Sequence, residues 1–143
     1  MLFRSCIVMF TKILAAIDGS ETSMEALGEA TRLAVSHQAT LRIVYAVADS
    51  DEADPQVGLR LLERAKAAVG DGLDVETRVL QAEAEYGLNG ITEAIAVAAN
   101  EWDTDLMVVG TAHRRGLERL VIGSVAEQLV AKVDASMLLV RTR

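Results

Sequence analysis

Short apolar runs alternate with longer segments of helical periodicity along most of the chain. The apolar runs end at glycine, aspartate or loop-forming residues, which is typical of strands. Several of them are apolar throughout, as strands are when a parallel sheet is covered on both faces. Residues 74–80 instead alternate apolar and polar positions and predict a half-exposed strand near an edge. The expected strands are residues 12–17, 40–47, 74–80, 106–109 and 137–140.

Amphipathic stripes of helical spacing lie between these runs. The first begins after Ser20, a residue type that commonly caps a helix N-terminus. The second ends at Gly70 and Gly72, since glycine often follows a helix. Residues 48–56 and 81–90 are expected loops. The inward-facing residues are predicted to be Met24, Leu27, Thr31 and Ala34; Val57, Leu61, Ala65 and Ala68; Ile91, Ala94, Ile95 and Ala98; and Val125, Leu129 and Val133.

The resulting order is β-α-β-α-β-α-β-α-β, without an internal repeat or linker. This order predicts one α/β domain whose parallel sheet carries helices on both faces. Ligands of such sheets bind outside the carboxyl ends of the strands, where the strand order reverses. Two of these ends carry polar turns with a glycine, Asp18-Gly19-Ser20 and Gly110-Thr111-Ala112-His113. We expect the two turns to form the walls of one crevice.

The stretch from Leu106 to Val125 carries the strongest indication of a binding site. A strand ends at Gly110, a basic loop follows, and Gly123 and Ser124 are expected to open the last helix. Free amide groups at a helix N-terminus, together with the positive end of the helix dipole, bind anions. The alternative is structural: Gly110 ends a strand and Ser124 caps a helix. The spacing alone leaves both interpretations open.

Composition narrows the possible functions. The 143 residues fit one domain, and 51% hydrophobic with 24% charged residues is ordinary for a globular protein. The net charge of -7 argues against general nucleic-acid binding, which depends on basic surface. The single cysteine, Cys6, rules out an intramolecular disulfide and fits a reducing cytoplasm. The two histidines, His37 and His113, are too far apart in sequence to suggest a metal site.

Residues 1–10 are interpreted as a leader outside the domain, which is expected to cover residues 11–143. The apolar runs of this segment are too short to span a bilayer. It also lacks a convincing signal-peptide cleavage site. Met9 is therefore a candidate for the true start of the protein.

The stretch GTAHRRGLERLVIGSVAEQL resembles the signature of the universal stress protein family, in which G-x-x-G, nine residues and G-[S/T] follow one another. KILAAIDGSETSMEAL is similar to the first strand and helix of the family, and DVETRVL, DLMVVGT and MLLVR resemble its later strands. The resemblance covers residues 11–141 without a large insertion. It implies a three-layer α/β/α fold of the adenine nucleotide alpha hydrolase-like type, with five parallel strands in the order 3-2-1-4-5.

The resemblance also implies a cytoplasmic, ATP-binding regulator of the stress response, with Mg2+ beside the phosphates. Asp18 would lie against the nucleoside, and the backbone near Ala46 would face the adenine edge. Asp18 has a simpler interpretation as a turn residue before Gly-Ser. The residues expected to contact the nucleotide are Ala16, Ile17, Asp18, Ala46, Gly110, Thr111, His113, Arg114, Gly123, Ser124 and Val125.

One position departs from the family pattern. His113 stands where the motif has its second glycine, and its imidazole would either intrude on the nucleotide or contact the phosphates beside Arg114. The main alternative function is therefore a dimeric interaction module that keeps the fold and binds no nucleotide. A third is a slow nucleotide hydrolase, although no residue pattern indicates a dedicated general base. The resemblance also implies a homodimer through residues 137–140, an apolar segment suited to pairing at a sheet edge.

Overall fold

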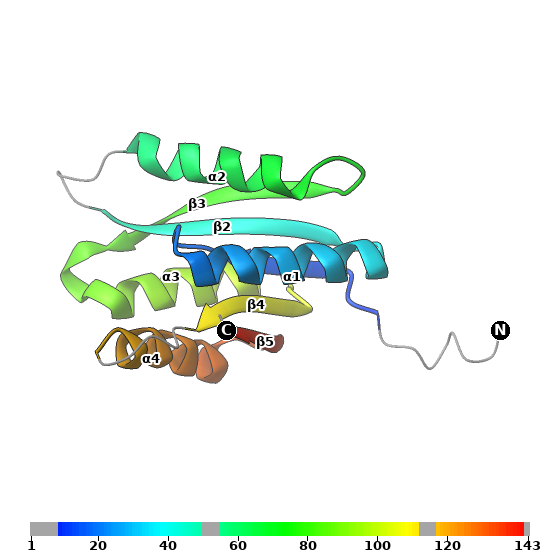
Figure 1. Cartoon of the computed structure of the whole chain (residues 1–143). Coiled ribbons are helices and arrows are strands. Elements are labelled where there is room, and N and C mark those ends of the chain that lie inside the picture. Colours follow the sequence, from blue (N-terminus) through cyan, green and yellow to red (C-terminus); the bar gives the residue numbers. More distant parts are fainter. Residues whose placement is uncertain (1–8, 50–54, 112–116, 142–143) are drawn as a thin grey trace.

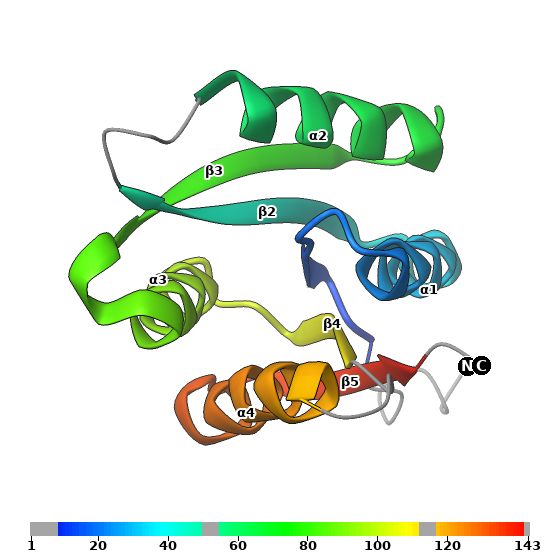
Figure 2. The same ribbon diagram turned by 60° about the vertical axis from the view of Figure 1, so that its left-hand side comes forward.

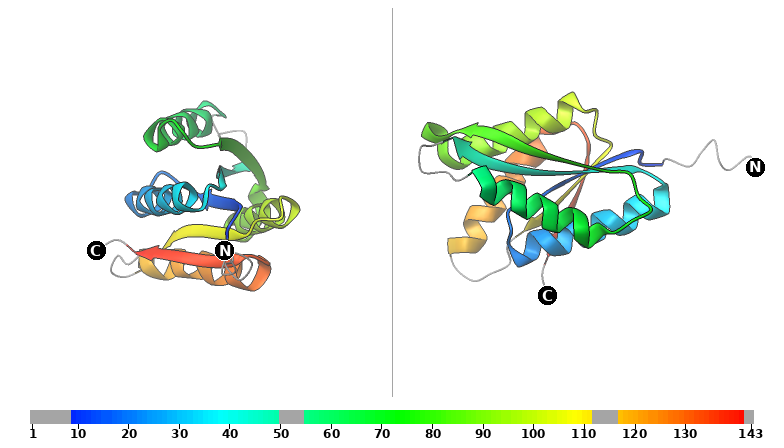
Figure 3. Two further views of the ribbon diagram at one scale, coloured as in Figure 1. Left: turned by 90° about the vertical axis from the view of Figure 1, so that its right-hand side faces the viewer. Right: turned by 90° about the horizontal axis from the view of Figure 1, so that it is seen from above.

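The computed structural model of the chain describes residues 9–49, 55–111 and 117–141, which form a three-layer α/β/α sandwich (Figure 1). A single parallel sheet has the strand order β3-β2-β1-β4-β5, as expected. Helices α1 and α2 cover one face, and α3 and α4 cover the other (Figures 2 and 3). The strands are β1 (Lys12–Ala16), β2 (Thr40–Asp49), β3 (Val75–Glu83), β4 (Leu106–Thr111) and β5 (Ser136–Arg141).

The second, third and fourth helices begin earlier than the sequence pattern predicted. Most of the expected loop over residues 81–90 is regular structure, because β3 continues to Glu83 and α3 begins soon afterwards. Gly90 permits this tight connection: a Cβ atom there would lie 2.7 Å from the carbonyl oxygen of Glu83. None of the helices in the described part of the chain has the length and apolar character needed to cross a membrane. The helical segments are α1 (Glu21–His37), α2 (Pro55–Val69), the 3-10 turn η2 (Ala84–Tyr86), α3 (Gly87–Glu101) and α4 (Leu117–Lys132).

After Lys12, strand β1 is an uninterrupted apolar run because helices cover both of its faces. Ile13 and Ala15 pack with α1 and α2, whereas Leu14 packs with α3 and α4. All three are 0% exposed. Successive side chains of a strand point to opposite faces, so a strand covered on both faces must be apolar at every position.

The inward face of α2 agrees only in part with the prediction: Ala65 is buried and Leu61 packs against the core as expected, but other positions differ. Val57 was expected inside and is 49% exposed, whereas Gly58, Leu62 and Ala65 are buried. Gly58 lies against the ring of Tyr45, where a Cβ atom would approach the Tyr45 Cδ2 atom to 2.9 Å. The absence of a side chain at Gly58 therefore fixes the rotation of α2 on the sheet.

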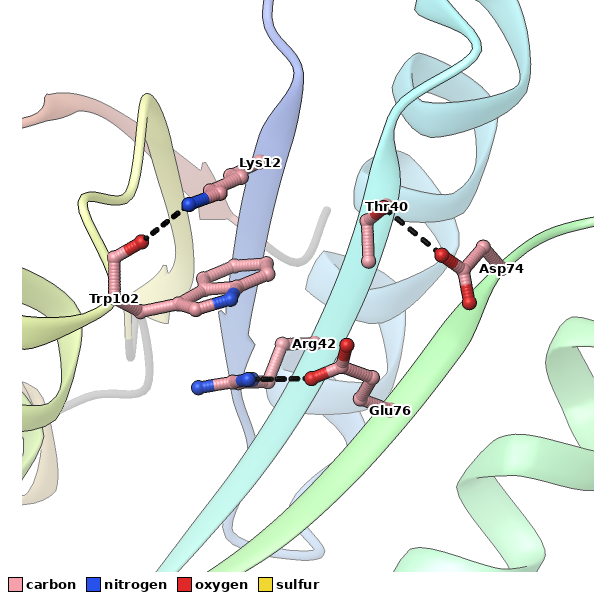
Figure 4. Close-up of polar contacts among 6 residues, drawn as sticks. All are labelled: Lys12, Thr40, Arg42, Asp74, Glu76 and Trp102. Atoms are coloured by element: carbon pink, nitrogen blue, oxygen red, sulfur yellow. Dashed lines mark hydrogen bonds and ion pairs between the residues drawn. The ribbon is translucent and has the colours of Figure 1, made fainter.

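A cluster of charged and aromatic side chains connects the amino ends of three strands to the end of α3 (Figure 4). The guanidinium of Arg42 lies 4.3 Å from the centre of the Trp102 ring, and the Nζ atom of Lys12 lies 5.8 Å from it. Lys12 Nζ also donates to the carbonyl oxygen of Trp102 at 3.1 Å. Arg42 Nε donates to Glu76 Oε1 at 2.9 Å. These contacts join the beginnings of β1, β2 and β3 to the end of α3.

Asp105 forms a second set of contacts, three hydrogen bonds, at the same end of the sheet. Its Oδ2 atom accepts hydrogen bonds from the backbone amide of Thr11 at 2.9 Å, the Thr11 hydroxyl at 2.6 Å and the backbone amide of Lys12 at 2.9 Å. These bonds, the Thr11 hydroxyl foremost, hold the pKa of Asp105 below its usual value, although partial burial acts in the opposite direction. The carboxylate therefore ties the start of β1 to the start of β4.

Candidate functional site

A cavity of about 300 Å3 opens at the carboxyl ends of β1, β2 and β4. The chain runs from β1 outward to β3 and then returns to β4 on the other side of β1, so the strand order reverses here. The sequence predicted a crevice at this reversal. The expected site residues that do line the cavity are Ala16, Ile17, Asp18, Ala46, Gly110 and Val125.

Other expected site residues lie elsewhere or outside the described part of the chain. Thr111 ends β4 and is not part of the cavity wall. His113 and Arg114 lie outside the described residues.

The prediction that Gly123 and Ser124 open the last helix is wrong in this structure. Helix α4 begins at Leu117, so both residues lie within it. Residues 117–120 (LERL) all have high helix propensity, which explains the earlier start. Within a helix, backbone amides donate to carbonyls four residues earlier and are not free to bind an anion. The backbone amides of Gly123 and Ser124 therefore lie inside α4 and not at its N-terminus, where the sequence pattern had placed them.

The turn after β1 is built by hydrogen bonds among its own residues. The Asp18 carboxylate accepts the amide of Ser20 at 2.8 Å, and the Ser20 hydroxyl accepts the amide of Ser23 at 3.1 Å, which caps α1. The Ser23 hydroxyl accepts the amide of Asp18 at 3.2 Å. Gly19 has a φ of 86°, a left-handed conformation that suits glycine. Asp18 is thus both the turn residue of the simpler interpretation and an exposed carboxylate at the cavity.

Gly110 is required by packing between β4 and α1. A Cβ atom at this position would lie 2.7 Å from Thr22 Cγ2 and 2.8 Å from the Thr22 carbonyl oxygen. Contacts this short with backbone atoms cannot be relieved without moving the start of α1. The sequence placed Gly110 among the residues expected to contact the nucleotide, and the structure adds that the packing of α1 on β4 itself requires a residue without a side chain here.

Sequence reasoning missed much of the cavity wall. The missed residues on the far side are Ile91 and Ile95 of α3, and Ala126 and Leu129 of α4. The helical spacing of Ile91, Ile95 and Leu129 was attributed to core packing alone, and Ala126 was not predicted to face inward. Among the described wall residues Asp18 is the one charged group, so the cavity can enclose a largely apolar part of a ligand and contact a polar group of the same ligand at Asp18.

Comparison with known proteins decides the family. The model of the universal stress protein family matches residues 9–141. The chain belongs to the universal stress protein family. Among curated relatives, a universal stress protein of Methanocaldococcus jannaschii is 30% identical, with 93% of this chain and 83% of the relative aligned. One from Bacillus subtilis is also 30% identical, with 93% of this chain and 100% of the relative aligned.

Solved structures of family members share the fold. A universal stress protein in complex with cAMP has a TM-score of 0.72 at 21% identity, covering 95% of this chain and 100% of that one. One from Archaeoglobus fulgidus in complex with dAMP has a TM-score of 0.68 at 17% identity, covering 93% of this chain and 99% of that one. This universal stress protein thus has the adenine nucleotide alpha hydrolase-like fold that the family resemblance implied.

Proposed function

We propose that this universal stress protein is a cytoplasmic regulator that binds an adenine nucleotide, ATP or a related compound, in the cavity at the carboxyl ends of β1, β2 and β4. The observation that carries the proposal is the convergence of Asp18, Ala46, Gly110 and Val125 on one cavity at the reversal of strand order. Family members of the same fold have been solved with cAMP and dAMP, which supports an adenine nucleotide as the ligand class.

The cavity suits the nucleoside part of such a ligand. Its volume of about 300 Å3 is at the lower end of ligand pockets, and its floor is made of small or apolar residues such as Ala16 and Val109. Asp18 stands at the mouth, where a ribose hydroxyl could donate to it. A triphosphate would extend beyond this volume, with Mg2+ neutralising part of its charge.

The start of α4 sets the condition for binding a triphosphate. If Gly123 and Ser124 are to offer their amides to phosphate oxygens, the part of α4 before Gly123 must unwind. Unwinding costs free energy, and this cost lowers the affinity for ATP relative to that for a nucleotide with fewer phosphates. The same feature favours the second candidate function, a dimeric interaction module that binds no nucleotide. Any hydrolysis would be slow, because Asp18 is the one carboxylate among the described wall residues and already accepts the amide of Ser20.

Calorimetric titration of nucleotide-stripped protein with Mg-ATP, AMP and cAMP tests the proposal. We expect at least one of these ligands to bind and Ala46→Leu, which fills the cavity floor, to weaken binding by about tenfold or more. Ala67→Leu, the same change at an exposed position of α2, should leave the affinity unchanged. Absence of heat with all three ligands at millimolar concentration would reject nucleotide binding in favour of the interaction module.

We propose in addition that the protein is a homodimer paired through β5. This strand is one edge of the sheet, and Leu139 within it is 43% exposed. An exposed apolar edge strand is a template for pairing with a second chain. Leu139→Pro removes a backbone donor from β5, so light scattering should show the wild type as a dimer and the variant as a monomer. The control variant is Val130→Ser, which changes an exposed apolar residue outside the sheet and should leave the dimer intact. A dimer that persists in Leu139→Pro would exclude this interface.

A further inference from the structure

A groove of about 560 Å3 follows the opposite edge of the sheet. One wall is formed by five consecutive residues of β3, residues 79–83, and the other by one side of α3. β3 is paired with β2 on one side only, so the backbone groups of its outer side have no strand partner in the described chain. Figure 2 shows α2 and α3 on opposite sides of this edge.

Helix α3 presents two different surfaces. Ile91 and Ile95 face the cavity proposed for the nucleotide. Ala94, Val97 and Ala98 line the groove instead, and Val97 is 44% exposed. The groove is therefore separate from the cavity and has an apolar floor that the described chain leaves open to solvent.

The groove has the length of a short strand. Helix α3 borders it from Gly90 to Glu101, which corresponds to about 16 Å of helix. About five residues of extended chain cover the same distance, which matches the five residues of β3 on the other wall. An extended segment could therefore hydrogen-bond to β3 and place alternate side chains on the floor at Ala94 and Val97.

The charge of the groove selects among possible occupants. The charged residues in its wall, as far as the structure describes it, are Glu83, Glu93 and Glu101, and no lysine or arginine is among them. Glu93 accepts the Nζ atom of Lys132 at 2.7 Å, whereas Glu83 and Glu101 have no ion-pair partner among the described residues. Another copy of this chain, with a net charge of -7, complements such a surface poorly.

We propose that this groove is the docking site for an extended, basic segment of a partner protein. The segment adds a strand to β3 and buries alternate apolar side chains against α3. Its lysine or arginine side chains meet Glu83 from the other face of the strand and Glu101 at one end of the groove. Main-chain hydrogen bonds supply affinity in strand addition, and the pockets and charges beside the strand supply specificity. Free carboxylates at the edge also discourage β3 from pairing with a second acidic copy.

A pair of synthetic peptides tests the proposal with the full chain. The first is about ten residues long and alternates valine with lysine, and the second carries glutamate in place of lysine. Fluorescence anisotropy of the labelled peptides should show binding of the basic peptide alone. Because the attraction is electrostatic, raising the salt concentration should weaken it. Amide shifts in NMR spectra should concentrate on residues 79–83.

Substitutions in the groove locate the binding. We expect Val97→Lys, or Glu83→Gln combined with Glu101→Gln, to weaken binding of the basic peptide by about tenfold or more. Val35→Lys on α1, and Glu25→Gln combined with Glu63→Gln, are matched changes at exposed positions outside the groove and should have no effect.

Three results would overturn the proposal. The first is binding of neither peptide at millimolar concentration, and the second is equal binding of both. The third is self-association that disappears in Val97→Lys, because the occupant would then be a second copy of the chain. Circular dichroism of each variant separates loss of the groove from loss of the fold.

Discussion

Replacing Gly110 by alanine is expected to lower the free energy of unfolding by about 2 to 3 kcal/mol. The new methyl group would lie 2.7 to 2.9 Å from side-chain and backbone atoms of Thr22, so the start of α1 must move away from β4. Urea unfolding followed by circular dichroism measures the loss. Because Gly110 also lines the cavity, any nucleotide affinity should fall with it.

Gly28→Ala is the matched control for this experiment. Gly28 lies within α1, and a Cβ atom there would meet only the flexible end of Arg32, at 3.9 Å. Alanine in a helix interior should therefore raise stability by about 0.5 to 1 kcal/mol. If Gly110→Ala proves as stable as the wild type, the close approach of β4 to α1 is not a constraint on the fold.

Replacing Asp105 by alanine is expected to lower the free energy of unfolding at neutral pH by about 2 kcal/mol. The change removes the acceptor for three hydrogen bonds from Thr11 and Lys12, and thereby unfastens the start of β1 from β4. The carboxylate is partly exposed, so each bond contributes less than a fully buried one would. Urea titration at pH 7 measures the difference.

The difference in stability between the wild type and Asp105→Ala should become smaller at acidic pH. The folded-state pKa of Asp105 is lowered, so its carboxylate stabilises the fold above the unfolded pKa of 3.8 and ceases to do so as the pH falls through the folded value. The gap between wild type and Asp105→Ala should therefore shrink once the pH drops below about 4. Asp71→Ala, in the exposed turn after α2, should show no such gap. A gap of equal size at pH 7 and pH 3 would mean that the charge of Asp105 contributes nothing.

The sheet was predictable because its pattern depends on local physics. Strand β1 must be apolar on both faces, and the turn after it carries a capping serine, Ser20, directly before α1. The alternation of residues 74–80 agrees with the position of β3 at an edge. These features lie within a few neighbouring residues, so the elements could be predicted from local patterns, whereas the strand order came from the family resemblance.

The errors came from contacts between residues far apart in the chain. The rotation of α2 depends on Gly58 meeting the ring of Tyr45 from β2, which no periodicity within α2 reveals. The role of Gly110 against Thr22 was missed for the same reason, since β4 and α1 are distant in sequence. One further error has a local cause: the pair Gly123-Ser124 was interpreted as the start of α4, although good helix formers precede it.

The position of Trp102 makes it a fluorescence reporter of changes at the amino ends of the strands. It is the only tryptophan in the chain, and it lies between Lys12 and Arg42 at the amino ends of the strands. The cavity opens at the carboxyl ends of the strands, which is the opposite end of the sheet from Trp102. A bound nucleotide cannot touch the indole directly, so a change in its emission on adding ligand would report a rearrangement transmitted along β1 and β2.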